Sequence, residues 1–180
     1  MDWSIRPARK DDASAIARVE VDTWRVTYRD LLPESYLQGM SYYRREISWH
    51  DLIAVAPRRG YPYVAECRGS LVGFILGGAE RYGDTKFPTE LYALYILPAH
   101  QKKGIGRALV GVLAQQLIAD GYTSMLVRVL KDNPASHFYQ ALGAEFLGSR
   151  PELLGSLHIV VLEYGWRDIT TLLPAKMDAQ

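Results

Sequence analysis

The chain has 180 residues, of which 48% are hydrophobic and 23% are charged, and its Lys and Arg residues (21) nearly balance its Asp and Glu residues (20). This composition is ordinary for a folded globular protein and excludes a disordered chain, and the net charge of +1 gives no support to a nucleic-acid-binding protein. The single cysteine, Cys67, excludes an internal disulfide and is interpreted as a buried, inert thiol because it ends an apolar run.

The N-terminal part predicts a short strand followed by two helices. Residues 3–8 alternate weakly between apolar and polar side chains, which favours a strand. Asp12 can cap a helix that follows, and Pro33 ends it. A second helix is predicted at 41–53. The residues expected on the inner face of the first helix recur at helical spacing: Ile16, Val19, Thr23 and Val26.

The middle of the chain changes to the period of β-strands. Residues 61–68 and 70–79 are predicted to form a hairpin, with Gly69 in its tight turn. Residues 80–89 are polar and contain Gly and Pro, so they predict a loop. The run LYALYIL at 91–97 is apolar at both parities, which is typical of a central strand covered on both faces.

The C-terminal part predicts two more helices and three strands. Apolar positions across 105–117 have the spacing of an amphipathic helix. Residues 125–130 form a strand, and the Asn-Pro pair that opens 133–142 is a typical helix start. Two last strands are expected near 145–148 and 157–164.

The whole pattern predicts one α/β domain over residues 1–180, because its order is β-α-α-β-β-β-α-β-α-β-β around a mixed sheet. The N-terminus lacks the apolar core of a signal peptide, and no stretch approaches the ~18 apolar residues of a membrane span. A cytoplasmic protein without a membrane partner is therefore expected.

The stretch YILPAHQKKGIGRALV, residues 95–110, carries the strongest chemical signal. Glycines among cations, between a strand and a helix, predict that backbone amides hold a phosphate. A P-loop is excluded because its G-x-x-x-x-G-K-[ST] spacing is absent. A dinucleotide motif is excluded because Leu109 stands where a third glycine is needed.

What remains is the pattern Q-x-x-G-x-G, formed by Gln101, Gly104 and Gly106. The amides of 102–107 begin a helix, so they lack partners within it and carry its positive dipole end. Nearby cationic side chains add to this charge: Lys102, Lys103 and Arg107. An ordinary strand-to-helix turn with solvated lysines is the alternative interpretation.

The run ELYALYILPAHQKKGIGRAL, followed by NPASHFYQALGA, resembles the GNAT superfamily of acyl-CoA-dependent N-acetyltransferases. The first run is similar to the family's motif A and the second to its motif B. The resemblance is specific over residues 90–145 and extends to the whole chain in the order of its elements. It implies a single GNAT-type domain with a mixed, mostly antiparallel sheet of six to seven strands, flanked by about four helices.

The resemblance also implies acetyl-CoA as co-substrate. Its pyrophosphate would lie on the glycine loop, and its pantetheine arm would pair with the end of the central strand, where this strand diverges from 125–130. Asn133 matches an asparagine that contacts this arm, although Asp132 occupies the more usual spacing, and both remain open. The implied acetyl-CoA-binding residues are Leu94, Tyr95, Ile96, Gln101, Lys102, Lys103, Gly104, Ile105, Gly106, Arg107, Asn133 and Ser136.

The implied reaction is aminolysis of a thioester, in which an amine must lose a proton and a thiolate must gain one. Glu90 stands where some family members carry a catalytic base acting through water, and Tyr139 matches the family's general acid. The oxyanion would be stabilised by a backbone amide near Ile96. A solvated strand-end carboxylate and a core tyrosine are the alternatives.

The acceptor is expected to be a primary amine of a small molecule or a peptide, and no nucleic acid is expected as partner. Aromatic side chains could hold it, with core packing as the alternative: Trp24, Tyr28, Tyr82 and Tyr92. The histidines lack metal-ligand spacing, so no metal is expected. A non-catalytic acyl-CoA-binding module is the second functional hypothesis, and monomer and homodimer both remain open.

Overall fold

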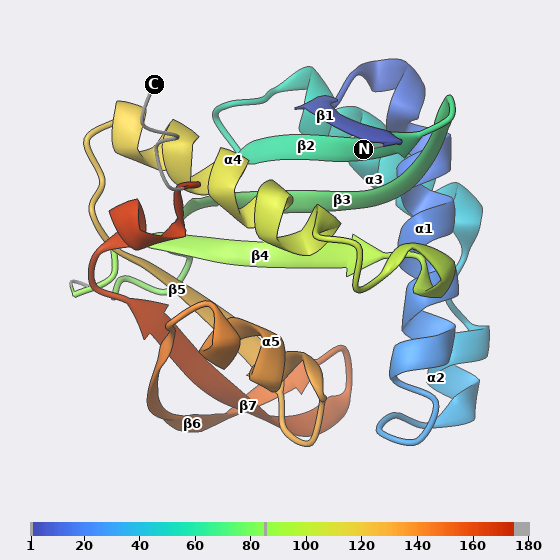
Figure 1. The fold of residues 1–180 in the computed structure, drawn as a ribbon. Coiled ribbons are helices and arrows are strands. Elements are labelled where there is room, and N and C mark those ends of the chain that lie inside the picture. Colours follow the sequence, from blue (N-terminus) through green and yellow to red (C-terminus); the bar gives the residue numbers. More distant parts are fainter. Residues whose placement is uncertain (1, 85, 175–180) are drawn as a thin grey trace.

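The computed structural model describes residues 2–84 and 86–174, which fold around one seven-stranded sheet (Figure 1). The strand order is β1-β2-β3-β4-β5-β7-β6, and only the pair β4 and β5 is parallel. The strands are β1 (Trp3–Pro7), β2 (Tyr61–Cys67), β3 (Ser70–Ala79), β4 (Thr89–Ile96), β5 (Met125–Leu130), β6 (Glu145–Leu154) and β7 (Leu157–Trp166). The predicted mixed, mostly antiparallel sheet is confirmed.

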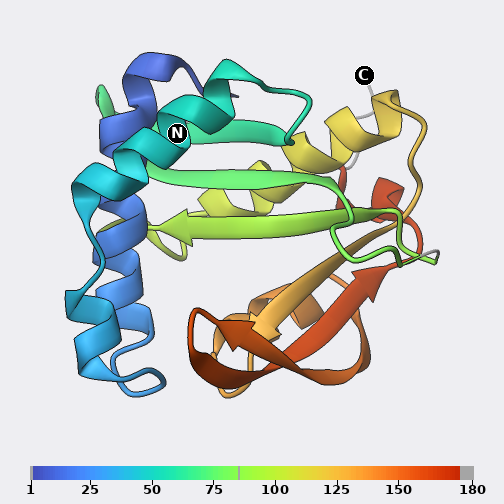
Figure 2. The ribbon, with the colours of Figure 1, turned by 180° about the vertical axis from the view of Figure 1, so that it is seen from behind.

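Helices cover both faces of this sheet (Figures 1 and 2). On the face covered by α1 and α3, Phe74 of the sheet packs edge to face with Trp49 of α3, at 4.8 Å between ring centroids. On the opposite face, α4 and α5 cover Leu91 and Val127. The helices are α1 (Ala13–Thr27), α2 (Glu34–Gln38), α3 (Tyr42–Ala54), α4 (Ile105–Ala119) and α5 (Ala135–Ala141).

Most predicted elements are present, and the differences are local. The short helix α2 was not predicted, and β6 continues to Leu154 rather than ending near residue 148. Val26 was expected on the inner face of α1 but is 53% exposed, because the buried face centres on Ile16, Ala17 and Glu20 and leaves Val26 at its margin. Within the described residues, no helix has the length and apolar character needed to cross a membrane.

The parallel pair β4 and β5 is the central feature of the sheet. Its strands are joined by α4, as a parallel connection requires. They pair at only two positions, Glu90 with Leu126 and Leu91 with Val127. Beyond these positions the two strands diverge, whereas β3 stays paired with β4 as far as Ile96. Within the described residues, the part of β4 after Leu91 therefore has no strand partner on the edge that faces β5.

Candidate active site

The loop between β4 and α4 presents a row of free amides. Gly104 caps α4 in the left-handed conformation, at φ 83°, which glycine adopts without strain. Among the hydrogen bonds of the described residues, none is donated by the amides of residues 102–107. Six successive donors at a positive helix end form a site that suits an anion such as a pyrophosphate.

The side chains of this loop have two different roles. Gln101 donates from Nε2 to the carbonyl of Ile96 (3.0 Å), and Lys103 donates from Nζ to the carbonyl of Ala99 (2.8 Å), so both side chains brace the turn. Lys102 and Arg107 extend into solvent instead. The loop's backbone is thus the main candidate for the anion contact, with two exposed cations beside it.

Gly106 brings the loop close to α5. A Cβ at this position would lie 3.2 Å from the Phe138 ring and 3.3 Å from the Ile96 side chain. These separations are tight for carbon atoms, so glycine lets the first turn of α4 approach α5 and the end of β4. The loop, β4 and α5 consequently meet at one place.

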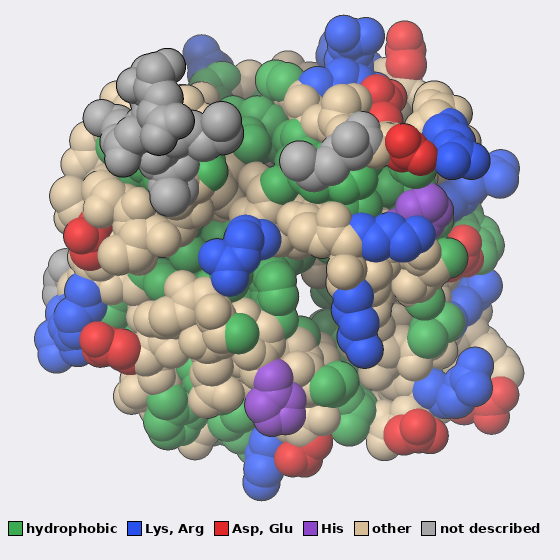
Figure 3. Space-filling view, viewed as in Figure 1, with side chains coloured by type: hydrophobic (Ala, Val, Ile, Leu, Met, Phe, Trp, Pro, Cys, Tyr) green, Lys and Arg blue, Asp and Glu red, His purple; other side chains and the backbone are tan. Residues whose placement is uncertain are grey.

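That place is the opening between β4 and β5. Figure 3, seen from the side of α4 and α5, shows a deep hollow near the centre of this face, bordered on one side by Lys and Arg side chains. Leu94, Tyr95 and Ile96 pair with β3 on one edge and lie beyond the last pairing with β5 on the other. Their free edge can receive an extended ligand as an additional strand would be received.

Tyr139 comes from α5 and is 5% exposed. Its ring packs edge to face against Phe138 and Trp166, at 5.3 and 6.1 Å between centroids. Burial raises the pKa of its hydroxyl well above the usual value, and the nearby Tyr28 raises it further. Within the described part of the chain, this hydroxyl makes no hydrogen bond with the protein, so it is available as a proton donor to a ligand.

The structure at the start of α5 distinguishes Asn133 from Asp132, the two candidates for contact with the pantetheine arm. Asn133 is buried, and its Oδ1 accepts a hydrogen bond from the amide of Ala135 (2.9 Å). Ser136 donates from Oγ to the Asn133 carbonyl (3.1 Å). Asp132 is exposed, at φ 68°. Asn133 is therefore buried with its side chain bound to the first amide of α5, whereas Asp132 faces solvent.

Two of the predicted acceptor-binding aromatics lie close to this opening. Trp24 and Tyr28 pack at 4.6 Å between centroids, and Trp24 and Tyr95 at 6.2 Å. The hydroxyls of Tyr28 and Tyr95 are 3.5 Å apart. Burial raises the pKa of Tyr28, while hydrogen bonds with Tyr95 and Asn133 lower it. Side chains from α1, β4 and the start of α5 thus converge beside Tyr139.

Glu90 lies at the start of β4 and is fully buried. Arg81 approaches it from the β3–β4 loop with two nitrogens, including Nε at 3.0 Å from Oε2. Arg128 of β5 places Nη1 at 2.9 Å from the same oxygen. The alternative of a solvated strand-end carboxylate is excluded, because two guanidiniums and the sheet enclose Glu90. Its role as a base stays a prediction.

Sequence reasoning missed both arginines. Arg128 did carry a signal, since it is the one charge in the apolar strand MLVRVL and a buried charge needs a partner. It also pairs with Glu80 (2.7 Å) and Glu163 (2.8 Å). Arg81 lies in a polar loop and carried no such signal.

The other two predicted acceptor-binding aromatics belong to this charged group. The Tyr92 ring lies 4.8 Å from the Arg81 guanidinium carbon, and its hydroxyl donates to the Ala79 carbonyl. The half-exposed Tyr82 donates to Glu152 (2.9 Å). Three guanidinium carbons lie within 6 Å of the Tyr82 ring, those of Arg81, Arg128 and Arg150. The four aromatics therefore form two groups rather than one pocket.

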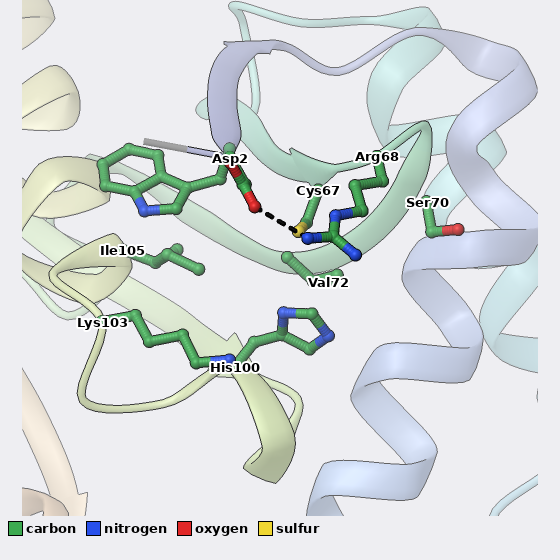
Figure 4. Close-up of a pocket in the computed structure, with 9 residues that line it drawn as sticks. Asp2, Cys67, Arg68, Ser70, Val72, His100, Lys103 and Ile105 are labelled. Atoms are coloured by element: carbon green, nitrogen blue, oxygen red, sulfur yellow. Dashed lines mark hydrogen bonds and ion pairs between the residues drawn. The ribbon is translucent and has the colours of Figure 1, made fainter.

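A cavity of about 600 Å³ adjoins the glycine loop (Figure 4). It shares Lys103 and Ile105 with the loop, and its remaining lining includes Trp3, Arg68 and His100. Arg68 pairs with Asp2 at 2.9 Å, and both side chains are well exposed. Cys67 also lines this cavity and is half-buried, so its expected full burial is wrong; it ends β2 beside an open turn.

Comparison with known proteins assigns the family. The family model described as Acetyltransferase (GNAT) family matches residues 21–144. The chain belongs to the GNAT family of acetyltransferases. It is 32% identical to the N-acetyltransferase YuaI of Bacillus subtilis (strain 168), over 94% of this chain and 95% of that protein. It is 31% identical to the L-amino acid N-acyltransferase MnaT of Escherichia coli (strain K12), over 93% and 90%.

Solved structures agree with this GNAT assignment at the level of the fold. PaiA N-acetyltransferase from Thermoplasma acidophilum, in complex with coenzyme A, superposes with a TM-score of 0.71 at 18% identity, covering 92% of this chain and all of that one. YncA from Salmonella typhimurium, with its cofactor acetyl-CoA, gives a TM-score of 0.67 at 20% identity, with 92% and 94% covered. Among the described residues, no group of three or more potential metal ligands occurs.

Proposed function

We propose that this GNAT enzyme transfers the acetyl group of acetyl-CoA to a primary amine of a small molecule or peptide by direct attack. The observation that carries the proposal is the opening between β4 and β5, with free amides at one end, and the buried Tyr139 comes from α5, which packs against the loop that carries these amides. Relatives solved with coenzyme A and acetyl-CoA support the donor. The name of MnaT supports amino acids among the acceptors to be tested.

The residues present fit this donor along its length. The amides of 102–107 match a pyrophosphate, and the free edge of β4 matches the amide-containing pantetheine arm. The adjoining cavity offers the Trp3 ring for a base and the cations Arg68 and Lys103 for a phosphate. We therefore place the 3′-phosphoadenosine end of the donor in this cavity.

Acetyl-CoA supplies a thioester carbonyl carbon, and the protein's groups move the protons around it. Glu90 first accepts a proton from the ammonium through a water, which leaves a neutral amine to attack. The nitrogen loses its second proton to solvent as the new C–N bond forms. A backbone amide near Ile96 stabilises the oxyanion. Tyr139 donates its proton to the departing thiolate as the C–S bond breaks. The products are an N-acetylated amine and a free thiol.

Binding of the donor should stabilise the protein measurably. At an acetyl-CoA concentration 100 times its Kd, the gain is about 2.7 kcal/mol, because only the folded state binds. For a domain of this size we expect Tm to rise by about 5–11 °C in differential scanning fluorimetry. Acetyl-pantetheine, which lacks the pyrophosphate and the nucleotide, should give a much smaller rise. Equal shifts for both compounds would contradict the placement of the pyrophosphate.

Turnover tests the function itself. Purified protein with acetyl-CoA should release free thiol when given a suitable primary amine from a panel of amino acids, polyamines, aminoglycosides and peptides. The matching tertiary amines are the control, because they cannot lose a proton to give a stable amide. If acetyl-CoA raised Tm while every amine failed, a non-catalytic acyl-CoA-binding module would replace the enzyme.

A further inference from the structure

Arg81 and Glu90 form an ion pair whose two halves differ in exposure. The guanidinium faces the carboxylate with Nε and Nη2, one nitrogen to each oxygen. Such two-point pairing is the strongest geometry available to these groups. The Glu90 side chain is fully buried, whereas the Arg81 side chain is 48% exposed. The cation therefore lies between the buried carboxylate and the solvent.

Arg81 can move away from Glu90 without leaving the buried carboxylate unpaired. Arg128 is 6% exposed and keeps its own contact with Glu90, at 2.9 Å from Nη1 to Oε2. It is fixed by Glu80 and Glu163, at 2.7 and 2.8 Å. Removing one partner from a buried pair is costly when no other compensates the remaining charge. Here a second guanidinium stays in place.

Arg81 also has supports that do not depend on Glu90. Its guanidinium carbon lies 4.8 Å from the centre of the Tyr92 ring and 5.6 Å from that of the Tyr82 ring. Stacking of this kind favours a guanidinium by roughly 0.5–1 kcal/mol at exposed sites. By a small movement Arg81 can thus stay stacked against these rings while its Nε and Nη2 turn to another carboxylate.

The pair lies where the amine must arrive. Glu90 is in the first of the two register pairs that join β4 to β5, and the strands part after the second, Leu91 with Val127. Alternation along β4 places Glu90 on the sheet face opposite Leu91, whose side chain packs in the core beneath α4. An acceptor that replaced Arg81 would therefore be held beside the opening.

We infer that the acceptor is a free α-amino acid, whose carboxylate replaces Glu90 on Arg81 and whose ammonium replaces Arg81 on Glu90. This inference rests on the proposed function. The exchange conserves charge, because each partner of the internal ion pair receives an equivalent group from one zwitterion. It also brings the ammonium into direct contact with the proposed base, so for this acceptor Glu90 takes the proton without a mediating water and leaves a neutral amine to attack. An amine without a carboxylate has no group that can take Glu90's place on Arg81.

The test compares each L-amino acid with its primary amide as acceptor, using acetyl-CoA and thiol release. For the best substrate we expect kcat/KM for the acid to exceed that for the amide about 10–100-fold, the range for a hydrogen-bonded charged group. The α-amine of the amino acid amide loses its proton more readily than the α-amine of the free acid. A preference for the acid therefore cannot come from a larger fraction of neutral amine. Arg81→Ala should reduce the acid-to-amide ratio to within about threefold of unity.

Two further variants make the result decisive. Arg81→Lys keeps the charge but loses the two-point geometry, so an intermediate ratio is expected. Arg167→Ala removes an exposed arginine paired with Glu145 and should keep the wild-type ratio. The inference is overturned if the wild-type enzyme acetylates amides as well as acids, or if the Arg81→Ala enzyme keeps the preference for acids. Arg81 would then only stabilise its loop through the ion pair with Glu90. The acetyltransferase proposal itself fails only if no amine of any kind is acetylated.

Discussion

Tyr139→Phe is expected to lower kcat by a factor of about 100 to 10,000, the range that a positioned general acid contributes. Phenylalanine keeps the ring that packs against Phe138 and Trp166, so the core should not change. Because burial and Tyr28 raise the pKa of this hydroxyl, it remains a proton donor throughout the neutral and mildly alkaline range. Steady-state kinetics with a saturating amine measure the loss.

The interpretation depends on an unchanged affinity for acetyl-CoA, measured by calorimetry on the same variant. Tyr164→Phe is the matched control, since Tyr164 is buried in the same core cluster but comes from β7. This control should retain wild-type kcat. Unchanged turnover in Tyr139→Phe would remove Tyr139 from the acid role.

Glu90→Gln is expected to lower kcat/KM about 100-fold near neutral pH, because the amide cannot accept the amine's proton. The deficit should shrink as pH rises toward the pKa of a primary amine, about 10. There the amine already arrives without its extra proton. A pH series of kcat/KM, for wild type and variant together, measures this convergence.

Stability must be separated from chemistry in this variant. A neutral side chain between Arg81 and Arg128 can cost about 3–5 kcal/mol, the usual loss when a buried ion pair is broken. Glu163→Gln is the control, because it removes another partner of Arg128 by the same substitution. It should lower Tm yet keep the wild-type pH profile. A deficit in Glu90→Gln that stays constant across pH would indicate a positional role for Glu90.

The parts of the fold that were predicted correctly have strong local signals. The central strand β4 was recognised because it is apolar at both parities, and α4 because its apolar spacing continues over several turns. The helix α2 was missed because five residues are too few to show a period. The strand expected near 145–148 continues as β6 through Pro151 to Leu154. This proline fits because β6 is an edge strand, where a missing amide is tolerated.

The candidate site divides in the same way. The loop before α4 was predictable, because its glycines and cations are adjacent in sequence and its amides are unpaired by the geometry of a helix start. The group around Glu90 was not, because pairing within the sheet assembles it from a loop, β4 and β5. Neither Arg81 nor Arg128 lies within a sequence motif that would predict their common contact with Glu90.

The divergence of β4 and β5 opens the sheet between two packed layers. The core cluster under α4 and α5 contains Leu91 and Tyr139, whereas α1 and α2 enclose a separate cluster around Tyr28 and Leu37. The two clusters meet where Tyr28 lies near Tyr139, and substitutions far from this contact should contribute additively to stability. Under the proposed function the donor lies along β4 and the loop before α4, and the acceptor lies beside Arg81 and Glu90, so a GNAT domain of this design can change its acceptor during evolution while it conserves its donor.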